Sequence, residues 1–303
     1  MTKVLGLDSD SAITVFSSIV IPHESRGEIS ETDLENYLSK VVWKSFDVLR
    51  NEAAERLAVS EVDLILAGAR VVGIKVDGHE VMNPHGFSGK TLEISLSITM
   101  VKRGVLNINP NKQGEFPEVL ESSSVAAYLL SKSLAINNLL YLEIENDTTR
   151  VFLVTPTRTS YLNQFNWGLK DIVAAYTEEF GVLHETSREM YEKFIAGEVS
   201  SAVSEKMKKI FQSAFKKFID GLTLSLRDLS DLGFKKLPPI YLKSSFPLPQ
   251  EVHNKAVTLG KKKSKFRLVE QKIDVSDLVN NSPYNAYEWL NQLAKRRIKW
   301  LMP

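Results

Sequence analysis

The residues with the most direct bearing on chemistry form a short acidic turn, Glu145-Asn146-Asp147, between two apolar stretches. Two strands joined by such a turn have the frame of a hairpin that wraps the phosphates of a nucleotide. A hairpin of that kind needs glycine, so that backbone N–H groups can approach the anion, and a carboxylate that holds Mg²⁺ or a water. Here side chains and negative charge stand where phosphates would lie, so the turn predicts a phosphate site that has lost its ligand.

Composition limits the classes of protein to which the chain can belong. With 303 residues and 43% hydrophobic content, it can bury one large core or the cores of two domains. The net charge of +1 gives no overall field that would attract nucleic acid, so we expect no nucleic-acid partner. The absence of cysteine excludes disulfides and thiolate metal sites, and the five histidines are scattered, so no metal site is expected.

The sequence also predicts where the protein is found. It contains no apolar run of about 20 residues that would span a bilayer. Its N-terminus lacks the basic and then apolar build of a signal peptide. We therefore expect a cytoplasmic protein, with any membrane contact peripheral and on the inner face of the cell membrane.

The spacing of apolar residues predicts the elements that would position the acidic turn. Val4–Ile21 is predicted to be a β-hairpin with its turn at Asp8–Ser11, followed by a long amphipathic helix capped by Thr32 or Asp33. Further strands are predicted at Val62–Ala67, Leu92–Val101, Leu139–Ile144, Val151–Val154, Pro239–Lys243 and, as an edge strand, Phe266–Ile273. Further helices are predicted at Val119–Leu134, Lys170–Phe180, Thr186–Ala196, Ser200–Asp231 and from Pro283 to the C-terminus.

This order of strands and helices, with several short motifs, resembles the actin-like ATPase superfamily and, within it, the bacterial cell-division protein FtsA, up to about Pro249. Val4–Ala12 is similar to the first phosphate loop of that superfamily, with Asp8 and Ser11 matching and Asp10 in place of a glycine. Asn83–Lys90, Asn-Pro-His-Gly-Phe-Ser-Gly-Lys, is similar to the FtsA segment Asn-Pro-x-Gly-Leu-Ser-Gly and is the most specific landmark of the resemblance. Ile240–Pro247 stands where the family has an apolar strand followed by Thr-Gly-Gly.

The resemblance implies an α/β fold, actin-like (ribonuclease H-like), with two domains and a reduced inserted subdomain. Residues 1–140 would form the first half, with a short inserted hairpin at about 70–89, and residues 141–273 the second half. Residues 274–303 would form a C-terminal helix. Because FtsA uses the inserted subdomain in contacts between protomers, its reduction argues against the usual filament.

The resemblance also places a nucleotide cleft, which is expected to be vestigial. Its residues would be Asp8, Ser11, Glu143, Thr148 and Ser244, where Glu143 stands for the usual aspartate and Ser244 for a glycine. We expect no cofactor and no ATP hydrolysis, because the glycines that admit phosphates are missing. Two alternatives remain: weak ATP binding, in which Arg150 or Lys243 neutralises the phosphates, and an ATPase with divergent motifs, in which Glu143 and Asp8 hold Mg²⁺.

The C-terminal helix is the second candidate for a functional site, because basic residues fill one face and aromatic residues lie near its flanks. Helices of this kind lie in the headgroup region of anionic membranes, and FtsA tethers itself by one. The membrane-contacting residues would be Trp289, Arg296, Arg297 and Trp300. The other interpretation, a helix packed on the first half of the protein, remains open.

Together these observations predict a non-catalytic, FtsA-like scaffold or adaptor in bacterial cell division. Its partners would be cytoplasmic proteins, with the tubulin-like FtsZ or another divisome component as the candidate, and an anionic membrane surface. The alternative within the superfamily is the pilus-assembly protein PilM, which binds a short cytoplasmic peptide of a membrane partner.

Overall fold

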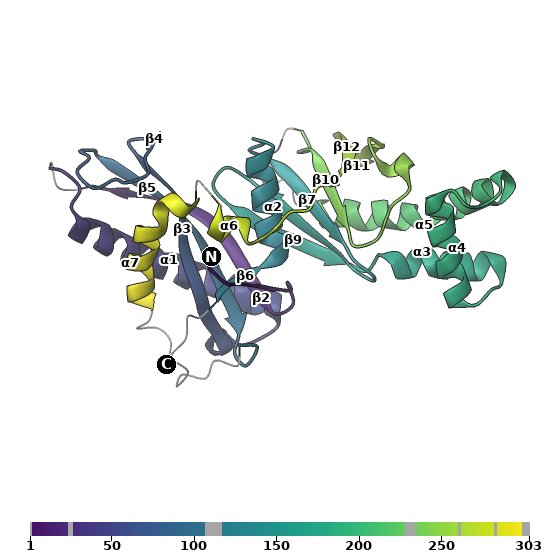
Figure 1. Cartoon of the computed structure of the whole chain (residues 1–303), viewed down its shortest axis with the longest axis horizontal. Coiled ribbons are helices and arrows are strands. Elements are labelled where there is room, and N and C mark those ends of the chain that lie inside the picture. The colour runs from purple at the N-terminus through teal and green to yellow at the C-terminus, as the bar shows by residue number, and fades with distance from the viewer. Residues whose placement is uncertain are drawn as a thin grey trace. The chain divides into compact units, whose positions relative to one another are not determined.

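The computed structural model describes residues 2–23, 27–106, 117–227, 234, 236–259, 262–281 and 284–298. Its chain divides into two compact units (Figure 1). Unit 1 comprises residues 1–135, 155–160 and 273–303, and unit 2 comprises residues 136–154 and 161–272. The chain thus passes from unit 1 to unit 2 and back twice.

Unit 1 contains a four-stranded antiparallel sheet in the order β2 (Ala12–Pro22), β5 (Thr91–Lys102), β3 (Leu64–Val76) and β4 (His79–Glu80). The alternation predicted for β5 is confirmed, because its apolar residues at every second position are all buried in one core: Leu92, Ile94, Leu96, Ile98 and Met100. Helix α1 (Glu31–Leu57) packs on this face. The 3-10 helix η1 (Glu61–Asp63) leads from α1 into β3.

The start of α1 differs from the prediction. Its cap is Ser30 rather than Thr32 or Asp33, because Ser30 Oγ accepts a hydrogen bond from Asp33 N, and the Asp33 carboxylate accepts one from Ser30 N in return. This reciprocal arrangement satisfies two backbone donors at once. The first turn of the helix therefore begins two residues earlier than a cap at Thr32 would allow.

The N-terminal hairpin predicted from the sequence is wrong in its pairing, although both strands form. The turn is present, since Asp8 O accepts hydrogen bonds from Ser11 N (3.0 Å) and Ala12 N (3.1 Å). However, β1 (Val4–Leu7) pairs in parallel with β6 (Glu118–Glu121), and β2 pairs with β5 along its whole length. A strand of 11 residues gains more ladder bonds from an equally long partner than from a strand of four.

The helix predicted at Val119–Leu134 also needs correction, because its first residues form β6. Helix α2 (Ser122–Ser133) follows β6 directly. A second, smaller core gathers Phe16, Val72 and Leu120 with residues of α2 and of α6 (Asp277–Asn280). The sheet of unit 1 is therefore covered by α1 on one face and by α2 and α6 on the other.

Unit 2 contains a six-stranded mixed sheet, whose last strand, β9 (Thr159–Phe165), begins with Thr159 and Ser160 of unit 1. The strand order is β11 (Ala256–Leu259), β12 (Lys262–Leu268), β10 (Ile240–Ser244), β7 (Leu139–Ile144), β8 (Thr149–Val154) and β9. β10 is parallel to both β7 and β12, whereas β7 and β8 form an antiparallel hairpin. The edge strand predicted at Phe266–Ile273 is therefore an inner strand that begins earlier, and β11 lies at the edge. The mixed α/β class predicted from the sequence is confirmed.

Helices α3 (Leu169–Phe180), α4 (His184–Ala196) and α5 (Ser201–Ser225) lie between β9 and β10 in the sequence, and the 3-10 helix η3 (Gln250–Val252) follows β10. Their apolar faces and one face of the sheet share a single core rich in aromatic rings. Trp167 anchors it, because the indole Nε1 donates a hydrogen bond to Ala214 O at 3.0 Å while the ring packs against Phe215 and Phe218.

The C-terminal segment returns to unit 1 as α6, a 3-10 turn, η4 (Tyr284–Tyr287), and α7 (Glu288–Ile298). In Figure 1, α7 lies beside β3. Tyr287, Leu290 and Leu293 are buried in the same core as α1. Within the described residues, no helix has the length and apolar character needed to cross a bilayer.

Candidate functional site

The predicted cleft residues belong to different units. Asp8 and Ser11 lie in the turn before β2 in unit 1, whereas Glu143, Thr148 and Ser244 lie on β7, β8 and β10 or their ends in unit 2. In each unit the residues lie beside the beginning of a helix. Because the exposed N–H groups and the dipole at a helix N-terminus attract anions, these two helix starts are the natural places for phosphates.

In unit 1 the helix start beside the Asp8–Ser11 turn is occupied by a glutamate that the sequence did not single out. Glu121, at the end of β6, is 0% exposed and caps α2 with its own side chain. One carboxylate oxygen accepts a hydrogen bond from Ser123 N (2.9 Å), and the other accepts one from Ser124 N (2.8 Å). The hydroxyl of Ser9, in the turn, donates to the same carboxylate.

The main chain of Glu121 is fixed as firmly as its side chain. Glu121 N donates to Thr14 Oγ1 at 2.7 Å, and that hydroxyl shares a hydrogen bond of 2.9 Å with Thr99 Oγ1. β1 runs close to the same helix start, since a Cβ atom on Gly6 would lie 2.8 Å from Ser122 Oγ. Two of the donors that would bind a phosphate at α2, Ser123 N and Ser124 N, are thus already bonded to protein oxygen atoms.

In unit 2 the acidic turn predicted from the sequence closes over the start of α3. The turn is tight, with Glu145 N donating to Thr148 O at 2.9 Å. The carbonyl oxygens of Glu145 and Asn146 accept hydrogen bonds from Leu169 N (3.3 Å) and Lys170 N (2.8 Å). Any side chain at position 168 would collide with the turn, because a Cβ on Gly168 would lie 2.2 Å from Glu145 O.

The charges of this region are paired within the protein. Glu143 lies opposite Arg150 on β8 and Lys243 on β10, and Lys243 Nζ is 3.6 Å from Glu143 Oε1. Arg150, which is buried, places Nη1 at 2.6 Å from Glu145 Oε2. Arg150 and Lys243, the two cations that could have neutralised a phosphate, therefore form ion pairs with glutamates. Ser244 Oγ accepts a hydrogen bond from Phe246 N at 3.3 Å.

The Asn83–Lys90 landmark is tied into unit 1 by the turn between β3 and β4. The carboxylate of Asp77 accepts hydrogen bonds from Lys90 N, Thr91 N and the Thr91 hydroxyl, at 2.8–2.9 Å for its shortest contacts. These bonds from Lys90 and Thr91 hold the pKa of Asp77 below its usual range. Phe87, within the landmark, is about half exposed.

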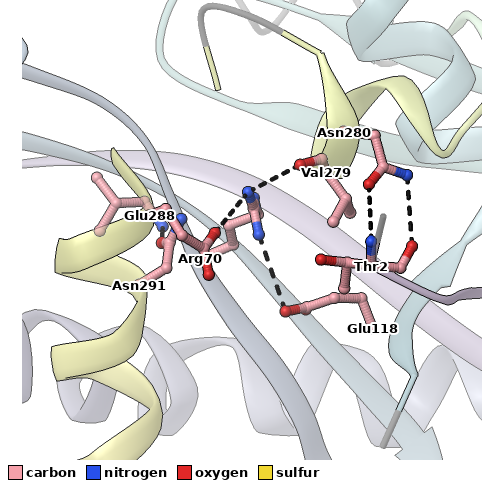
Figure 2. Close-up of polar contacts among 8 residues, drawn as sticks. Thr2, Arg70, Glu118, Val279, Asn280, Glu288 and Asn291 are labelled. Carbon is pink, nitrogen blue, oxygen red and sulfur yellow. Dashed lines mark hydrogen bonds and ion pairs between the residues drawn. The ribbon is translucent and has the colours of Figure 1, made fainter. Parts of the chain in front are cut away.

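Of the proposed membrane residues, Trp289 is partly buried against the core of unit 1. Arg296 and Arg297 lie in α7, but their side chains, like the whole of Trp300, lie outside the described residues. Figure 2 shows how this segment is held. Arg70, on β3, is 3% exposed and donates to Val279 O (3.2 Å) and to the Glu288 carboxylate (3.4 Å).

Two further contacts fix the C-terminal segment. Asn291, on α7, is 0% exposed and accepts a hydrogen bond from Val71 N at 2.7 Å. Asn280 exchanges hydrogen bonds with the backbone of Thr2 at 3.1 and 3.4 Å (Figure 2). No cluster of three or more metal-ligating side chains is found in the portion of the chain that the structure covers.

No protein-family model and no curated protein matches the chain. Solved structures similar to it include a chain of a PilM–PilN type IV pilus biogenesis complex, with 13% identity, a TM-score of 0.37, and coverage of 95% of this chain and 77% of that chain. An ethanolamine utilization protein, EutJ from Carboxydothermus hydrogenoformans, has 10% identity, a TM-score of 0.32, and coverage of 58% and 54%.

An archaeal actin homolog has 12% identity, a TM-score of 0.34, and coverage of 59% of this chain and 56% of the homolog. The chain thus spans about half the length of the EutJ and archaeal proteins that it matches. All of these superpositions have TM-scores below 0.5, so statements about the site depend on the contacts described above.

Proposed function

We propose that this protein is a non-catalytic scaffold of the actin-like class, which acts through protein partners rather than by turning over a nucleotide. The observation that carries this proposal is the buried Glu121 carboxylate, which already accepts the hydrogen bonds at the start of α2. The backbone oxygens of Glu145 and Asn146 likewise accept hydrogen bonds from the backbone N–H groups at the start of α3. A phosphate at α2 would have to displace the Glu121 carboxylate, and its charge would be repelled by that group if it stayed nearby.

The finer assignment that we propose is an FtsA-like adaptor in bacterial cell division. It would link a cytoplasmic partner such as FtsZ to the inner face of the cell membrane. The Asn83–Lys90 segment supports it, because these residues carry the resemblance to FtsA, and Phe87 offers an exposed apolar side chain for a protein contact. A PilM-like adaptor, which would bind a short peptide of a membrane partner of the PilN kind, is the competing outcome of the tests below.

The test of the closed site is thermal unfolding with and without millimolar ATP and Mg²⁺. A ligand at about 100 times its dissociation constant stabilises the native state by about 2.7 kcal/mol, which would raise the unfolding midpoint by several degrees. We expect the unfolding midpoint with ATP to be no higher than in nucleotide-free buffer of the same ionic strength and Mg²⁺ content. A nucleotide-specific rise would overturn the proposal and favour an ATPase with divergent motifs.

The partner is tested by cosedimentation with polymerised FtsZ, alone and with vesicles that contain anionic lipid. We expect the chain to enter the pellet with FtsZ polymer, and less of it to do so when Phe87 is replaced by serine. Val48→Ser, on the exposed face of α1, is the matched control. Binding to a PilN-type cytoplasmic peptide, without binding to FtsZ, would replace the division role with the pilus role.

A further inference from the structure

A small polar cavity lies within unit 1, and neither Glu121 nor the Asp8–Ser11 turn lines it. It is bounded by β2, β5, α2 and the segment Thr155–Ser160, and its volume is about 30 Å³. Ser17 and Arg158 form an isolated β-bridge beside it, and Ser18 N donates to Thr157 O at 3.1 Å, so the segment is attached to the edge of β2. The polar side chains that line it include those of Ser17, Ser18, Ser95, Lys132, Arg158 and Thr159, with Tyr128, Thr155 and Thr157 beside them.

Three polar atoms of the lining are buried and have no hydrogen-bond partner among the described residues. They are Ser17 Oγ, Thr159 Oγ1 and Arg158 Nε. Thr159 is only 2% exposed, so bulk water does not satisfy its hydroxyl. A buried polar group without a partner costs about 1–3 kcal/mol, and native proteins rarely leave one in this state. Three such atoms beside one cavity therefore indicate an occupant that accepts hydrogen bonds.

The lining favours a negatively charged occupant. Arg158 Nε is a donor only, and the two hydroxyls can donate. Ser18 Oγ and Ser95 Oγ share one hydrogen bond of 2.7 Å, so a proton of that pair is also left to donate. Lys132, exposed at the cavity, adds a second cation. The nearby carboxylate of Glu52 opposes an anion, but it is paired with Arg158 Nη2.

We propose that this cavity binds a small tetrahedral oxyanion of the phosphate or sulfate type. Ser17, Thr159 and Arg158 Nε donate hydrogen bonds to it, and Lys132 contributes charge. A single water needs roughly 10–15 Å³ of such space, so the cavity has room for about two waters or one small oxyanion, but not for a nucleotide. None of the residues predicted for the nucleotide cleft lines this cavity, so the proposal is independent of the proposed scaffold function.

The test uses the full chain and inorganic phosphate, with sodium chloride at the same ionic strength as the reference. Isothermal titration calorimetry and thermal unfolding are measured for the wild type, Thr159→Ser and Thr159→Val. We expect phosphate to bind the wild type and Thr159→Ser with similar affinity. Thr159→Val, which keeps the shape but removes the hydroxyl, should bind at least about tenfold more weakly, since a hydrogen bond to a charged group is lost.

Two further variants serve as a second test of the site and as a negative control. Lys132→Gln, at an exposed position, should fold normally and also weaken phosphate binding, so the proposal remains testable if Thr159→Val folds poorly. Thr223→Val, in unit 2, removes a hydroxyl that donates to Ile219 O at 2.7 Å, and should leave phosphate binding unchanged. The proposal is overturned if phosphate does no more than chloride, if Thr159→Val and Lys132→Gln bind like the wild type, or if the cavity holds ordered water alone in a crystal grown with phosphate.

Discussion

The Glu121 carboxylate lies out of contact with water, and its acceptors are used by the backbone amides that begin α2 and by the Ser9 hydroxyl. Glu121→Gln keeps the shape but turns one oxygen into an NH₂ group. One of the amides of Ser123 and Ser124 then faces a donor instead of an acceptor, and the favourable charge at the helix start is lost. We expect the free energy of unfolding to fall by about 1–3 kcal/mol in urea denaturation.

The matched control is Ser200→Ala. Ser200 is the cap residue of α5, it is exposed, and its side chain makes no capping hydrogen bond. We expect its replacement to change stability by less than about 0.5 kcal/mol. If Glu121→Gln were as stable as the wild type, the carboxylate would not be the group that closes the start of α2.

At the scale of single residues, the sequence drew attention to only one of the two helix starts described above. The acidic turn Glu145–Asp147 could be recognised because turn residues and charges are local in the sequence. Glu121 could not, because its role depends on Ser9, which lies 112 residues away in the chain. The only local signal was a glutamate directly before three serines at the start of an apolar helix, which is also consistent with a serine cap.

Among the elements, β3 has backbone groups along one edge that are not paired within the sheet. One edge of β3 pairs with β5, but β4 pairs with the other edge only at Lys75 and Val76. Further along this strand, Asn291 on α7 accepts the hydrogen bond of Val71 N. Asn291→Ala should leave that buried amide without an acceptor and lower the free energy of unfolding by about 1–3 kcal/mol, as measured in urea.

Gln292→Ala provides the control on the same helix, because Gln292 is exposed and neighbours Asn291 in the sequence. We expect it to unfold like the wild type. Equal stability of the two variants would mean that α7 is not held on β3 by this contact, and would favour a helix that is free to lie on a membrane.

The elements that the sequence predicted well are those whose pattern is long and regular. β5 alternates over Leu92–Met100, and its buried face could be read directly. β9 was missed because its exposed residues, Asn163 and Gln164, interrupt any apolar pattern. The pairing of β1 and β2 was wrong because a strand's partner depends on residues far away in the sequence, whereas a turn such as Asp8–Ser11 only indicates that the chain changes direction.

At the scale of the whole molecule, each unit has its own core. The main cluster of unit 1 gathers residues of α1, β3, β5 and α7, and the cluster of unit 2 gathers residues of α3, α5 and the six-stranded sheet. The two clusters share no residue. Cores that are separate in this way can open separately, because local stability follows the contacts of each cooperative region.

Native-state hydrogen exchange of a matched pair of leucine variants tests this independence. Leu92 on β5 and Leu142 on β7 are both fully buried in a sheet, and replacing either by alanine removes about 2–5 kcal/mol of packing. We expect Leu92→Ala to speed exchange in β2, β3 and β5 while leaving β7, β8 and β10 protected. Leu142→Ala should do the reverse. If either variant accelerated exchange equally in both sets of strands, the chain would open as one cooperative whole, and its two cores would not be energetically separate.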